Sequence, residues 1–387
     1  MNLKIKRVLS DAGVLLTRLT KGVDRASVLF ESFDGKSYSD NPRAISEKLH
    51  EMYPDVKISW LFRDVQAKKN VVPDYVTVID RRDKKAYMRA LATSGTVILN
   101  FPLTYFRKSK KQLVIQTNHG DRGFKKVYLD SPFSKRKPAE SIPGFCDLGV
   151  VGSDFGRDHL YMTAYDFKGR FIEKGTPRCD RLIRFDPEEA ARIRESLSIA
   201  PDKGILLYAP TLRRESHDSK TEQKAQELNI ASLLDRLEEA QERGFICLVR
   251  AHPNVVGLTG YGSDSRLMNV SAYEDMADLL LISDILVTDY SSCAGDFPLL
   301  GRAVYLYQPD REEYIEKDRT FYFDLDASPF WIAQTQEKLE EMAVSATEES
   351  IRDNDRAILD FFGTFESGSA REAVTDEIAR VHGWKRA

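Results

Sequence analysis

The sequence contains no run of about 18 apolar residues, so we predict that no helix of the chain spans a membrane. Its four cysteines, at positions 146, 179, 247 and 293, form no CxxC pair, and its six histidines form no HExxH pattern. We therefore predict no metal site. The cysteine usage fits a reducing, cytosolic setting, and Cys247 lies inside the apolar segment FICLV, where we expect a small core residue.

A strong charge imbalance is also absent. The 387 residues carry a formal net charge of −3, so we do not expect the molecule as a whole to bind polyanions. Residues 101–137 differ, because ten Lys and Arg residues stand there against Asp121 and Asp130. That stretch is either a solvated face or an electropositive mouth for a phosphorylated ligand. We recognise no nucleic-acid-binding module and predict no nucleic acid partner.

Residues 1–25 lack the hydrophobic core and cleavage site of a signal peptide, so we expect no secretory leader there. They predict an amphipathic helix instead. Basic residues point largely away from a broad apolar surface made by Leu3, Ile5, Val8, Leu9, Leu15, Leu16 and Leu19. This pattern is typical of an interfacial helix that rests on anionic lipid, and equally of an ordinary helix packed on its own domain.

The sequence also lacks Pro- or Ser-rich linkers, repeats, a Walker A sequence and a GxGxxG motif. Short β-rich segments alternate with helical ones, and the apolar runs predict strands at 27–32, 56–62, 75–79, 96–101, 112–117, 147–152, 204–210, 245–253, 284–289 and 303–307. Apolar strands separated by helices predict parallel sheets covered on both faces. We predict an α/β fold of two Rossmann-like, doubly wound domains that face a central cleft, joined near residues 174–189.

In such sheets ligands bind beyond the carboxyl ends of the strands, so polar motifs are expected there. One strand ends in VTDYSS, where Asp289 precedes Ser291 and Ser292, and a predicted amphipathic helix containing Asp296 follows. Serine hydroxyls and free backbone N–H groups at a helix start suit a phosphate group. The structural alternative is ordinary helix N-capping.

Two further strand ends carry cationic groups. In LVRAHPN, Arg250 and His252 occupy alternate positions and are predicted to point to the same side, which suits a phosphoryl group, while a hydrogen-bonded histidine is the structural alternative. In YAPTLRRE, Thr211 and Arg213 follow a third strand, and Arg213 is either a second phosphate clamp or a surface charge. These residues belong to the second set of strands.

The first set contributes TNHG, in which His119 ends a strand and Gly120 allows a sharp turn and the close approach of a ligand. Two histidines from opposite halves, with serines and arginines around them, suit displacement at an activated phosphorus or an anomeric carbon. One histidine would take the proton of an attacking hydroxyl, and the other groups would stabilise the leaving phosphate.

Seven segments in their order along the chain resemble the CDP-glycerol glycerophosphotransferase family, the teichoic-acid primases and polymerases of bacteria. They are ESFDGKSYSDNPRAI (31–45), QTNHG (116–120), GTPRCDRL (175–182), YAPTLR (208–213), RAHP (250–253), VTDYSSCAGDF (287–297) and FYFDL (321–325). The resemblance implies a GT-B-like fold, with an acceptor domain at 26–175 and a CDP-polyol donor domain at 176–387. It implies transfer of glycerol phosphate from CDP-glycerol to an acceptor hydroxyl, with release of CMP and no cofactor.

Residue by residue, the resemblance implies catalytic roles for His119 and His252. It implies that Thr211, Arg213, Ser291 and Ser292 hold the donor's phosphates, whereas Asp296 serves the ribose or only its helix. From their positions at the strand ends, we also expect Gly120, Arg250 and Asp289 to bind substrate. The family acts at the cytoplasmic face of the cell membrane on lipid-linked or polymeric glycan acceptors, which favours a peripheral membrane location and the interfacial interpretation of residues 1–25.

The chain departs from the family pattern beside the proposed base. Many members have a tryptophan before HG and Thr-Pro after it, whereas here Asn118 precedes and Asp121 and Arg122 follow. The acceptor, and the choice between glycerol and ribitol phosphate, therefore stay open, and Asp121 is also a candidate for orienting His119. No long extra N-terminal region of the kind carried by polymerases is present in the sequence, so we expect a primase or a capsule- or glycan-decorating enzyme.

Two other interpretations stay open at this point. One is a GT-B nucleotide-sugar glycosyltransferase or epimerase, which would share the fold and the phosphate-binding strand ends. The other is a non-catalytic membrane-surface protein that binds anionic glycans through residues 101–137. The sequence does not decide the oligomeric state.

Overall fold

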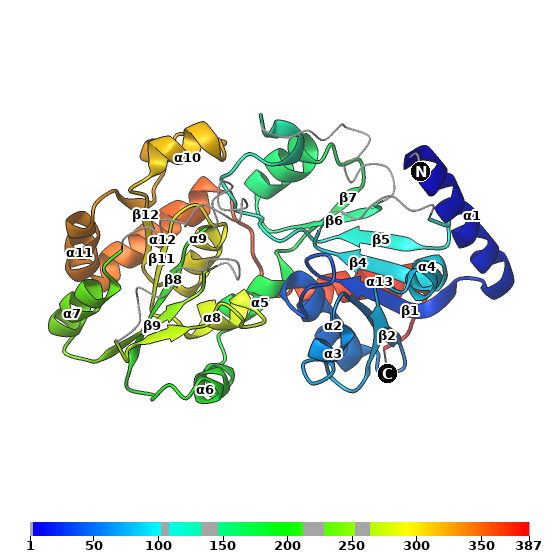
Figure 1. Ribbon diagram of the computed structural model, residues 1–387, viewed down its shortest axis with the longest axis horizontal. Coiled ribbons are helices and arrows are strands. Elements are labelled where there is room, and N and C mark those ends of the chain that lie inside the picture. The colour runs from blue at the N-terminus through cyan, green and yellow to red at the C-terminus, as the bar shows by residue number, and fades with distance from the viewer. Residues whose placement is uncertain (1–2, 102–107, 133–145, 212–227, 252–263, 387) are drawn as a thin grey trace. The chain divides into compact units, whose positions relative to one another are not determined.

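The computed structural model describes residues 3–101, 108–132, 146–211, 228–251 and 264–386, with side chains from residue 12 on. The chain forms two compact units. Unit 1 comprises residues 1–121, 136–180 and 365–387, and unit 2 comprises residues 122–135 and 181–364. Each unit contains a parallel sheet accompanied by helices (Figure 1), which confirms the predicted α/β class. The cleft between the halves stays a prediction.

The described strands of unit 1 form a seven-stranded parallel sheet in the order β3-β2-β1-β4-β5-β6-β7. They are β1 (Asp24–Glu31), β2 (Lys57–Phe62), β3 (Val76–Asp80), β4 (Ser94–Leu99), β5 (Leu113–Gln116), β6 (Leu148–Val151) and β7 (Arg170–Glu173). The central strands β4, β5 and β6 are buried along their whole length, as expected for apolar strands covered on both faces. The strand order reverses direction between β1 and β4, which we call the switch point of unit 1.

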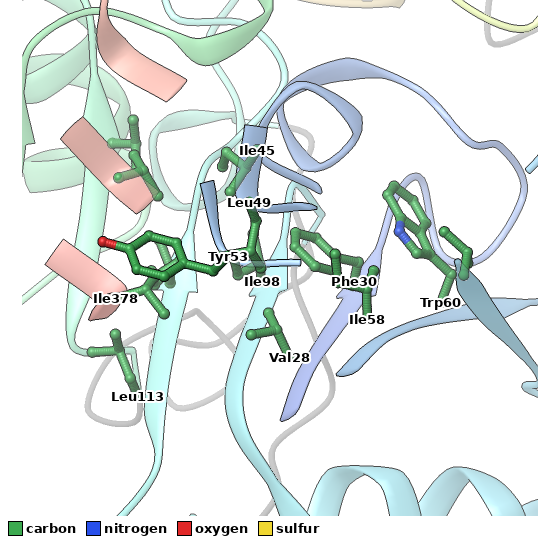
Figure 2. Close-up of a cluster of buried hydrophobic side chains, with 14 of the residues drawn as sticks. Val28, Phe30, Ile45, Leu49, Tyr53, Ile58, Trp60, Ile98, Leu113 and Ile378 are labelled. Carbon is green, nitrogen blue, oxygen red and sulfur yellow. The ribbon is translucent and has the colours of Figure 1, made fainter. Parts of the chain in front are cut away.

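Helices from both ends of the chain complete unit 1. They are α1 (Leu3–Lys21), α2 (Asp40–Met52), α3 (Val65–Lys68), α4 (Lys84–Thr93), the π-helix η3 (Gly156–Ala164), the 3₁₀ turn η4 (Pro177–Cys179) and α13 (Ala370–His382). Figure 2 shows Ile378 of α13 in one cluster with Ile45 and Leu49 of α2 and with Phe30 of β1. Truncating a buried isoleucine such as Ile378 to alanine would cost about 2–5 kcal/mol, so α13 is part of the core of unit 1.

The N-terminal helix α1 packs against α4. Val14 is fully buried, and the Arg18 guanidinium donates to Gln112 Oε1 at 2.8 Å and to the carbonyl oxygen of Ala92 at 3.3 Å. Leu15, Leu16 and Leu19 are 42%, 65% and 76% exposed. The described part of α1 therefore docks on unit 1 through one face and leaves leucines uncovered on another.

Unit 2 contains a second parallel sheet, six-stranded in its described part, in the order β10-β9-β8-β11-β12-β13. Its strands are β8 (Gly204–Ala209), β9 (Phe245–Val249), β10 (Leu267–Asn269), β11 (Ile285–Thr288), β12 (Val304–Tyr307) and β13 (Trp331–Ala333). Cys247 is fully buried in this core, as predicted. The direction of winding reverses between β8 and β11, the switch point of unit 2.

The described helices of unit 2 are α6 (Pro187–Ser196), α7 (Ile230–Gln241), α8 (Met276–Ile282), α9 (Cys293–Asp296), α10 (Arg311–Lys317), α11 (Gln336–Ser345) and α12 (Glu348–Phe361). Short 3₁₀ turns are η1 (Tyr128–Asp130), η7 (Phe297–Leu300) and η8 (Leu325–Ala327). Helix α5 (Asp180–Ile183) contains the boundary between the units. Local signals set these helices: α12, for example, begins with a capping box in which Thr347 and Ser350 bond each other's backbone N–H groups.

The units differ from the two contiguous domains predicted at 26–175 and 176–387. Residues 365–387 return to unit 1, because the Asp180 carboxylate accepts hydrogen bonds from the N–H groups of Ala370 and Arg371 at the start of α13. Residues 122–135 belong to unit 2, where Phe124 packs against Phe321, Phe323 and Phe330. Within the described residues, no helix combines the length and apolar character needed to cross a bilayer.

Candidate active site

In unit 1 the predicted site residue His119 lies just beyond the carboxyl end of β5, near the switch point. The ends of three strands meet there. Asn100, which follows β4, accepts a hydrogen bond from the Phe33 N–H at its Oδ1 (2.8 Å) and donates from its Nδ2 to Ser32 Oγ (3.0 Å). This is the position at which doubly wound sheets bind ligands.

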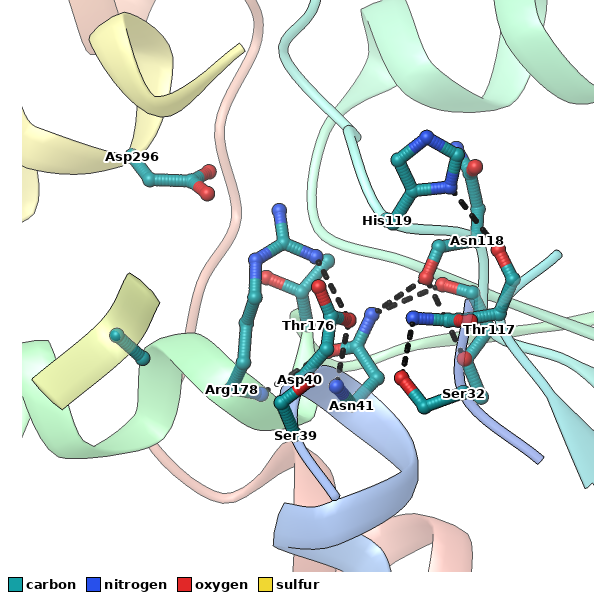
Figure 3. A network of polar contacts seen from close by, with 12 residues as sticks. Ser32, Ser39, Asp40, Asn41, Thr117, Asn118, His119, Thr176, Arg178 and Asp296 are labelled. Carbon is teal, nitrogen blue, oxygen red and sulfur yellow. Dashed lines mark hydrogen bonds and ion pairs between the residues drawn. The ribbon is translucent and has the colours of Figure 1, made fainter. Parts of the chain in front are cut away.

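The His119 ring is held in one orientation. Its Nδ1 lies 3.0 Å from the carbonyl oxygen of Asn100, and the ring centroids of Phe33 and Phe101 lie 5.3 and 6.0 Å from that of His119. Figure 3 shows the His119 ring beside Asn118 and Thr117. Because a carbonyl oxygen only accepts, Nδ1 carries the proton of the neutral ring and Nε2 carries the lone pair. The arrangement therefore prepares Nε2 to act as a proton acceptor.

The turn that presents His119 is made at a different residue from the one predicted. Asn118, and not Gly120, has the left-handed backbone conformation, with a φ of 50°. Asparagine tolerates this region because its short side chain can bond locally. The Asn118 N–H donates to Gln116 Oε1 at 2.9 Å, and its own Oδ1 accepts from the Tyr165 hydroxyl at 3.2 Å. Its amide is buried, and Nδ2 has no hydrogen-bond partner among the described residues.

Asn41, at the start of α2, fixes this turn from behind (Figure 3). Its Nδ2 donates to the carbonyl oxygens of Thr117 and Asn118 at 3.0 and 2.9 Å, and its Oδ1 accepts from the Arg178 N–H at 3.0 Å. The side chain is fully buried. One amide therefore satisfies three backbone groups from two segments of the chain, and the backbone beneath His119 is held firmly.

Asp121, considered above as a partner for His119, is buried in unit 1. Its Oδ2 accepts a hydrogen bond from Ser153 Oγ at 2.6 Å, and Ser153 Oγ in turn accepts from the Gly156 N–H at 2.9 Å. These contacts tie Asp121 to the start of the π-helix η3.

In unit 2, Thr211 and Asp289 lie at the switch point between β8 and β11. The Thr211 N–H donates to both carboxylate oxygens of Asp289, at 2.9 and 3.0 Å, and the Tyr290 N–H donates to Oδ1 at 2.5 Å. Asp289 is fully buried. The structure thus places Asp289 as the brace of two strand ends, which sets the backbone at Thr211.

Arg250 follows β9, which ends at Val249, so it stands just beyond the strand and not within it as predicted. Its N–H donates to the carbonyl oxygen of Tyr208 at 2.8 Å. Its Nη1 is buried and has no hydrogen-bond partner among the described residues. Burial lowers the pKa of Arg250, against the attraction of Asp275 and Asp278. A buried guanidinium nitrogen without a partner is unfavourable unless an anion completes it.

Ser291 and Ser292 are partly exposed after β11. The helix after them is shorter than predicted, since α9 covers only Cys293–Asp296 before the chain tightens into η7. A single turn has little macrodipole, so any anion there would rely mainly on the hydroxyls and N–H groups. Burial raises the pKa of the Cys293 thiol to about 11, so it stays protonated near neutral pH.

Asp296 and Arg122 form a buried ion pair. Arg122 Nη2 donates to Asp296 Oδ1 at 2.7 Å, and both side chains are buried. The pair favours the structural alternative for Asp296, and Arg122 belongs neither to a solvated face nor to an electropositive mouth. Lys108, from the same basic stretch, pairs with Asp147.

Of the predicted site residues, the structure describes His119 and Gly120 in unit 1 and Thr211, Arg250, Asp289, Ser291, Ser292 and Asp296 in unit 2. His252 and Arg213 lie outside the described residues, and their roles stay predictions. No cluster of His, Cys, Asp and Glu with the spacing of a metal site occurs in the described part of the chain.

Sequence reasoning missed three polar residues at or beside these strand ends. Asn100 ends the apolar segment TVILN and could have been found as a polar residue at a strand end, like His119. Asn41 does not follow a strand, but it lies in the segment 31–45 that resembles the family, and this was the signal that could have found it. Gln308 follows β12, is fully buried, and donates from Nε2 to the carbonyl oxygen of Asp289 at 2.8 Å. Its Oε1 has no partner among the described residues.

Comparison with known proteins extends these findings. The model of the CDP-glycerol:poly(glycerophosphate) glycerophosphotransferase family matches residues 14–380. A teichoic acid poly(glycerol phosphate) polymerase of Bacillus subtilis strain 168 is 29% identical over 400 residues, 98% of this chain and 53% of the relative. A teichoic acid glycerol-phosphate transferase of Staphylococcus aureus strain NCTC 8325 is 32% identical over 321 residues, 79% of this chain and 80% of the relative.

The solved structure of the wall teichoic acid polymerase TagF matches with a TM-score of 0.79 and 26% identity, covering 98% of this chain and 96% of that chain. The chain spans about half the length of two of the polymerases it matches, 53% of that from Bacillus subtilis and 52% of one from Staphylococcus epidermidis. The likeness to TagF gives the fold as GT-B-like. By the match over residues 14–380, this chain belongs to the CDP-glycerol:poly(glycerophosphate) glycerophosphotransferase family.

Proposed function

We propose that this chain transfers glycerol phosphate, or a related polyol phosphate, from CDP-glycerol to a hydroxyl of a membrane-linked or polymeric glycan acceptor, with release of CMP. The family and its teichoic acid relatives support the donor and the reaction class. The observation that carries the proposal is the His119 ring, whose Nδ1 lies against the Asn100 carbonyl oxygen at 3.0 Å, so that Nε2 is the basic nitrogen at the switch point of unit 1.

In this reaction the acceptor hydroxyl oxygen bonds to the β-phosphorus of the donor. The bond from that phosphorus to the bridging oxygen breaks, and CMP leaves with the bridging oxygen. The hydroxyl proton passes to Nε2 of His119, which acts as the general base. The chemistry is proton transfer and phosphoryl displacement, and we propose that it uses no cofactor.

Negative charge on the two phosphates would be met in unit 2. Arg250 Nη1 supplies a buried cationic donor. Thr211, which follows β8, and the partly exposed Ser291 and Ser292 lie beside the switch point of unit 2. Charge-assisted hydrogen bonds from such groups stabilise a leaving phosphate. We propose that His252 and Arg213 join this set, as their motifs imply.

The direct test is the His119→Ala variant. We expect CMP release from CDP-glycerol with a lipid-linked acceptor to fall at least about a hundredfold, the usual cost of losing a general base, with an unchanged melting temperature. His252→Ala is expected to behave alike. His50→Ala is the control, because that ring stacks on Tyr75 at 3.7 Å elsewhere in unit 1 and should leave turnover unchanged. Near-normal CMP release by His119→Ala would refute the assignment.

The donor is tested by thermal shift with CDP-glycerol, CDP-ribitol, CMP and UDP-sugars. We expect the cytidine compounds to raise the melting temperature, because ligands that bind only the folded state stabilise it. The size of the shift with each CDP-polyol decides between glycerol and ribitol phosphate. Stabilisation by UDP-sugars alone would favour a nucleotide-sugar enzyme.

We also propose that α1 rests on an anionic membrane surface. Leu15, Leu16 and Leu19 are exposed on a helix that ends at the exposed Lys21, and apolar contact combined with basic charge is the requirement for interfacial binding. Leu16→Glu with Leu19→Glu should reduce co-sedimentation with phosphatidylglycerol vesicles and leave turnover on a soluble acceptor unchanged. Val71→Glu, at an apolar residue 41% exposed elsewhere in unit 1, is the control. Equal sedimentation of all three proteins would exclude this role.

A further inference from the structure

Arg122 stands three positions after His119, yet it is anchored inside the other unit. Its Nε–H donates to the carbonyl oxygen of Gly295 at 2.8 Å, and its Nη2 donates to Asp296 Oδ1 at 2.7 Å. The side chain is fully buried. The chain that follows the proposed base is therefore fixed to α9, the helical turn directly after Ser291 and Ser292.

Gly295 shows how close this contact is. A Cβ atom there would lie 2.7 Å from the carbonyl oxygen of Arg122 and would also collide with the Arg122 Cβ. Backbone meets backbone at this point, which only glycine permits. Farther along, Lys125 forms a β-bridge with Phe321, and the Lys126 N–H donates to the carbonyl oxygen of Thr320 at 2.8 Å. The anchoring of this segment in unit 2 therefore continues beyond Arg122.

The preceding residue, Asp121, is anchored in unit 1 by Ser153 Oγ at 2.6 Å. A Cβ atom on Gly156 would lie 2.8 Å from the carbonyl oxygen of Asp121, so this contact is also a close backbone approach. Neighbouring Cα atoms are about 3.8 Å apart across a trans peptide, and that link cannot stretch. Two adjacent residues thus hold the chain to two different units, directly beyond His119.

We propose that Arg122 is a positioning residue for His119. Its guanidinium fixes the chain three residues beyond His119 to the turn that follows Ser291 and Ser292, the residues proposed to hold the donor phosphates. This inference rests on the proposed function. It differs from a purely structural role, in which the buried pair with Asp296 would stabilise unit 2 and nothing more.

The test is a double-mutant cycle between Arg122→Met and His119→Ala, read by CMP release with acceptor and by CDP-glycerol affinity. We expect Arg122→Met to slow turnover about a hundredfold, as a misplaced catalytic group does, and to leave donor affinity unchanged. In the His119→Ala background the same substitution should cost nothing further, because groups that act as a unit are not additive.

Arg122→Lys should recover part of the rate, since an ammonium still pairs with Asp296 but cannot reproduce the guanidinium fork. If Arg122→Met does not fold, the single variants Arg122→Lys and Asp296→Asn replace it in the double-mutant cycle. Arg302→Met is the matched control. Arg302 is a partly buried arginine just before the amino end of β12, where it donates to the carbonyl oxygens of Leu281 and Ser283. Its loss should lower the free energy of unfolding and leave turnover unchanged.

Two results would overturn the inference while leaving the proposed function in place. One is an equal loss of turnover from Arg122→Met in both backgrounds, and the other is a loss of donor affinity as large as the loss of turnover. Normal turnover by His119→Ala alone would instead remove the base itself, and that failure belongs to the proposed function.

Discussion

In unit 1 the polar groups behind His119 mostly bond one another, whereas in unit 2 Arg250 Nη1 and Gln308 Oε1 are buried without a partner among the described residues. In both sheets the first strand, β1 or β8, is central. The next two strands in the chain are added on one side of it, and the later strands on the other side. Asn41 and Asn100 each satisfy several neighbours at the first switch point. The two sheets share their strand order apart from the additional β7 of unit 1, but their switch points differ in how the polar groups are hydrogen-bonded.

The difference has a physical meaning. A buried donor or acceptor left without a partner costs about 1–3 kcal/mol, so folded proteins tolerate few of them outside ligand sites. Around His119, unit 1 uses most of its hydrogen-bonding capacity internally, with Asn118 Nδ2 as an exception among the described residues, and this fixes one ring with a defined tautomer. Unit 2 keeps a cationic donor and an amide oxygen unused, which suits a ligand that brings both acceptors and donors, such as a nucleotide phosphate with its ribose.

Removing the Asn41 amide should have a large effect on both stability and turnover, because it breaks the internally bonded side of this comparison. Asn41→Ala leaves two carbonyl groups and one N–H buried without their partner, and we expect a loss of about 3 kcal/mol in the free energy of unfolding. Turnover should also fall, since the turn beneath His119 loses its support. Denaturant unfolding and CMP release measure the two effects.

Asn354→Ala is the control for Asn41→Ala. Asn354 donates a single hydrogen bond, to the carbonyl oxygen of Pro329 at 2.6 Å, and its loss should cost about 1 kcal/mol with no change in turnover. If the two variants were equally stable and equally active, the network around Asn41 would have no special role.

Arg250→Ala tests the other side. We expect affinity for CMP and CDP-glycerol to fall about tenfold to a hundredfold, the value of a hydrogen bond to a charged group, while unfolding stability stays level or rises because a poorly paired buried charge is removed. Titration calorimetry measures the affinity. Arg266→Ala should do the reverse, since Arg266 pairs with Asp264, Asp235 and Glu238 before β10 and would lose stability without losing affinity. A destabilised Arg250→Ala with normal affinity would show that Arg250 is structural.

The strands that the sequence predicted are mainly those inside the sheets. Parallel strands buried on both faces read as continuous apolar runs, so β4, β5, β8 and β11 were found within two residues of their ends. Strands β7, β10 and β13 were missed. Each lies at the edge of its sheet and is only partly buried, so its sequence lacks that apolar run.

The site was predictable only as far as its signals are local. His119 and Arg250 directly follow apolar strands, and that position identified them. Arg122 bonds Asp296 from 174 positions away, and Asn41 bonds Asn118 from 77, so no window of the sequence contains both partners. In the sequence Asn118 stands out only as a departure from the family pattern beside His119, whereas its φ of 50° shows that it makes the turn.

The pH-dependent prediction concerns Asp355, on the buried face of α12 in unit 2. Both carboxylate oxygens are buried without a hydrogen-bond partner among the described residues, and burial raises the pKa of Asp355 from 3.8 to about 8. In unit 1 the equally buried Asp180 instead accepts two backbone N–H groups at 2.9 and 2.8 Å. Asp180 and Asp355 therefore repeat the contrast between the units, since the buried carboxylate is hydrogen-bonded in unit 1 and without a partner among the described residues in unit 2.

A carboxyl whose pKa is higher in the folded state retains a proton that the unfolded chain releases. Below the unfolded pKa both states are protonated, so Asp355 then has no effect. As pH rises from about 4 to about 8, the free energy of unfolding should decrease, by at most about 1.4 kcal/mol per pH unit. Asp355→Asn should make this decrease smaller, matching the wild type near pH 4 and exceeding its stability near pH 8 in denaturant titrations. Asp180→Asn should instead be less stable at every pH, because it weakens the cap of α13. A wild-type slope retained in Asp355→Asn would mean that other groups carry the pH dependence and that this carboxyl is hydrated in solution.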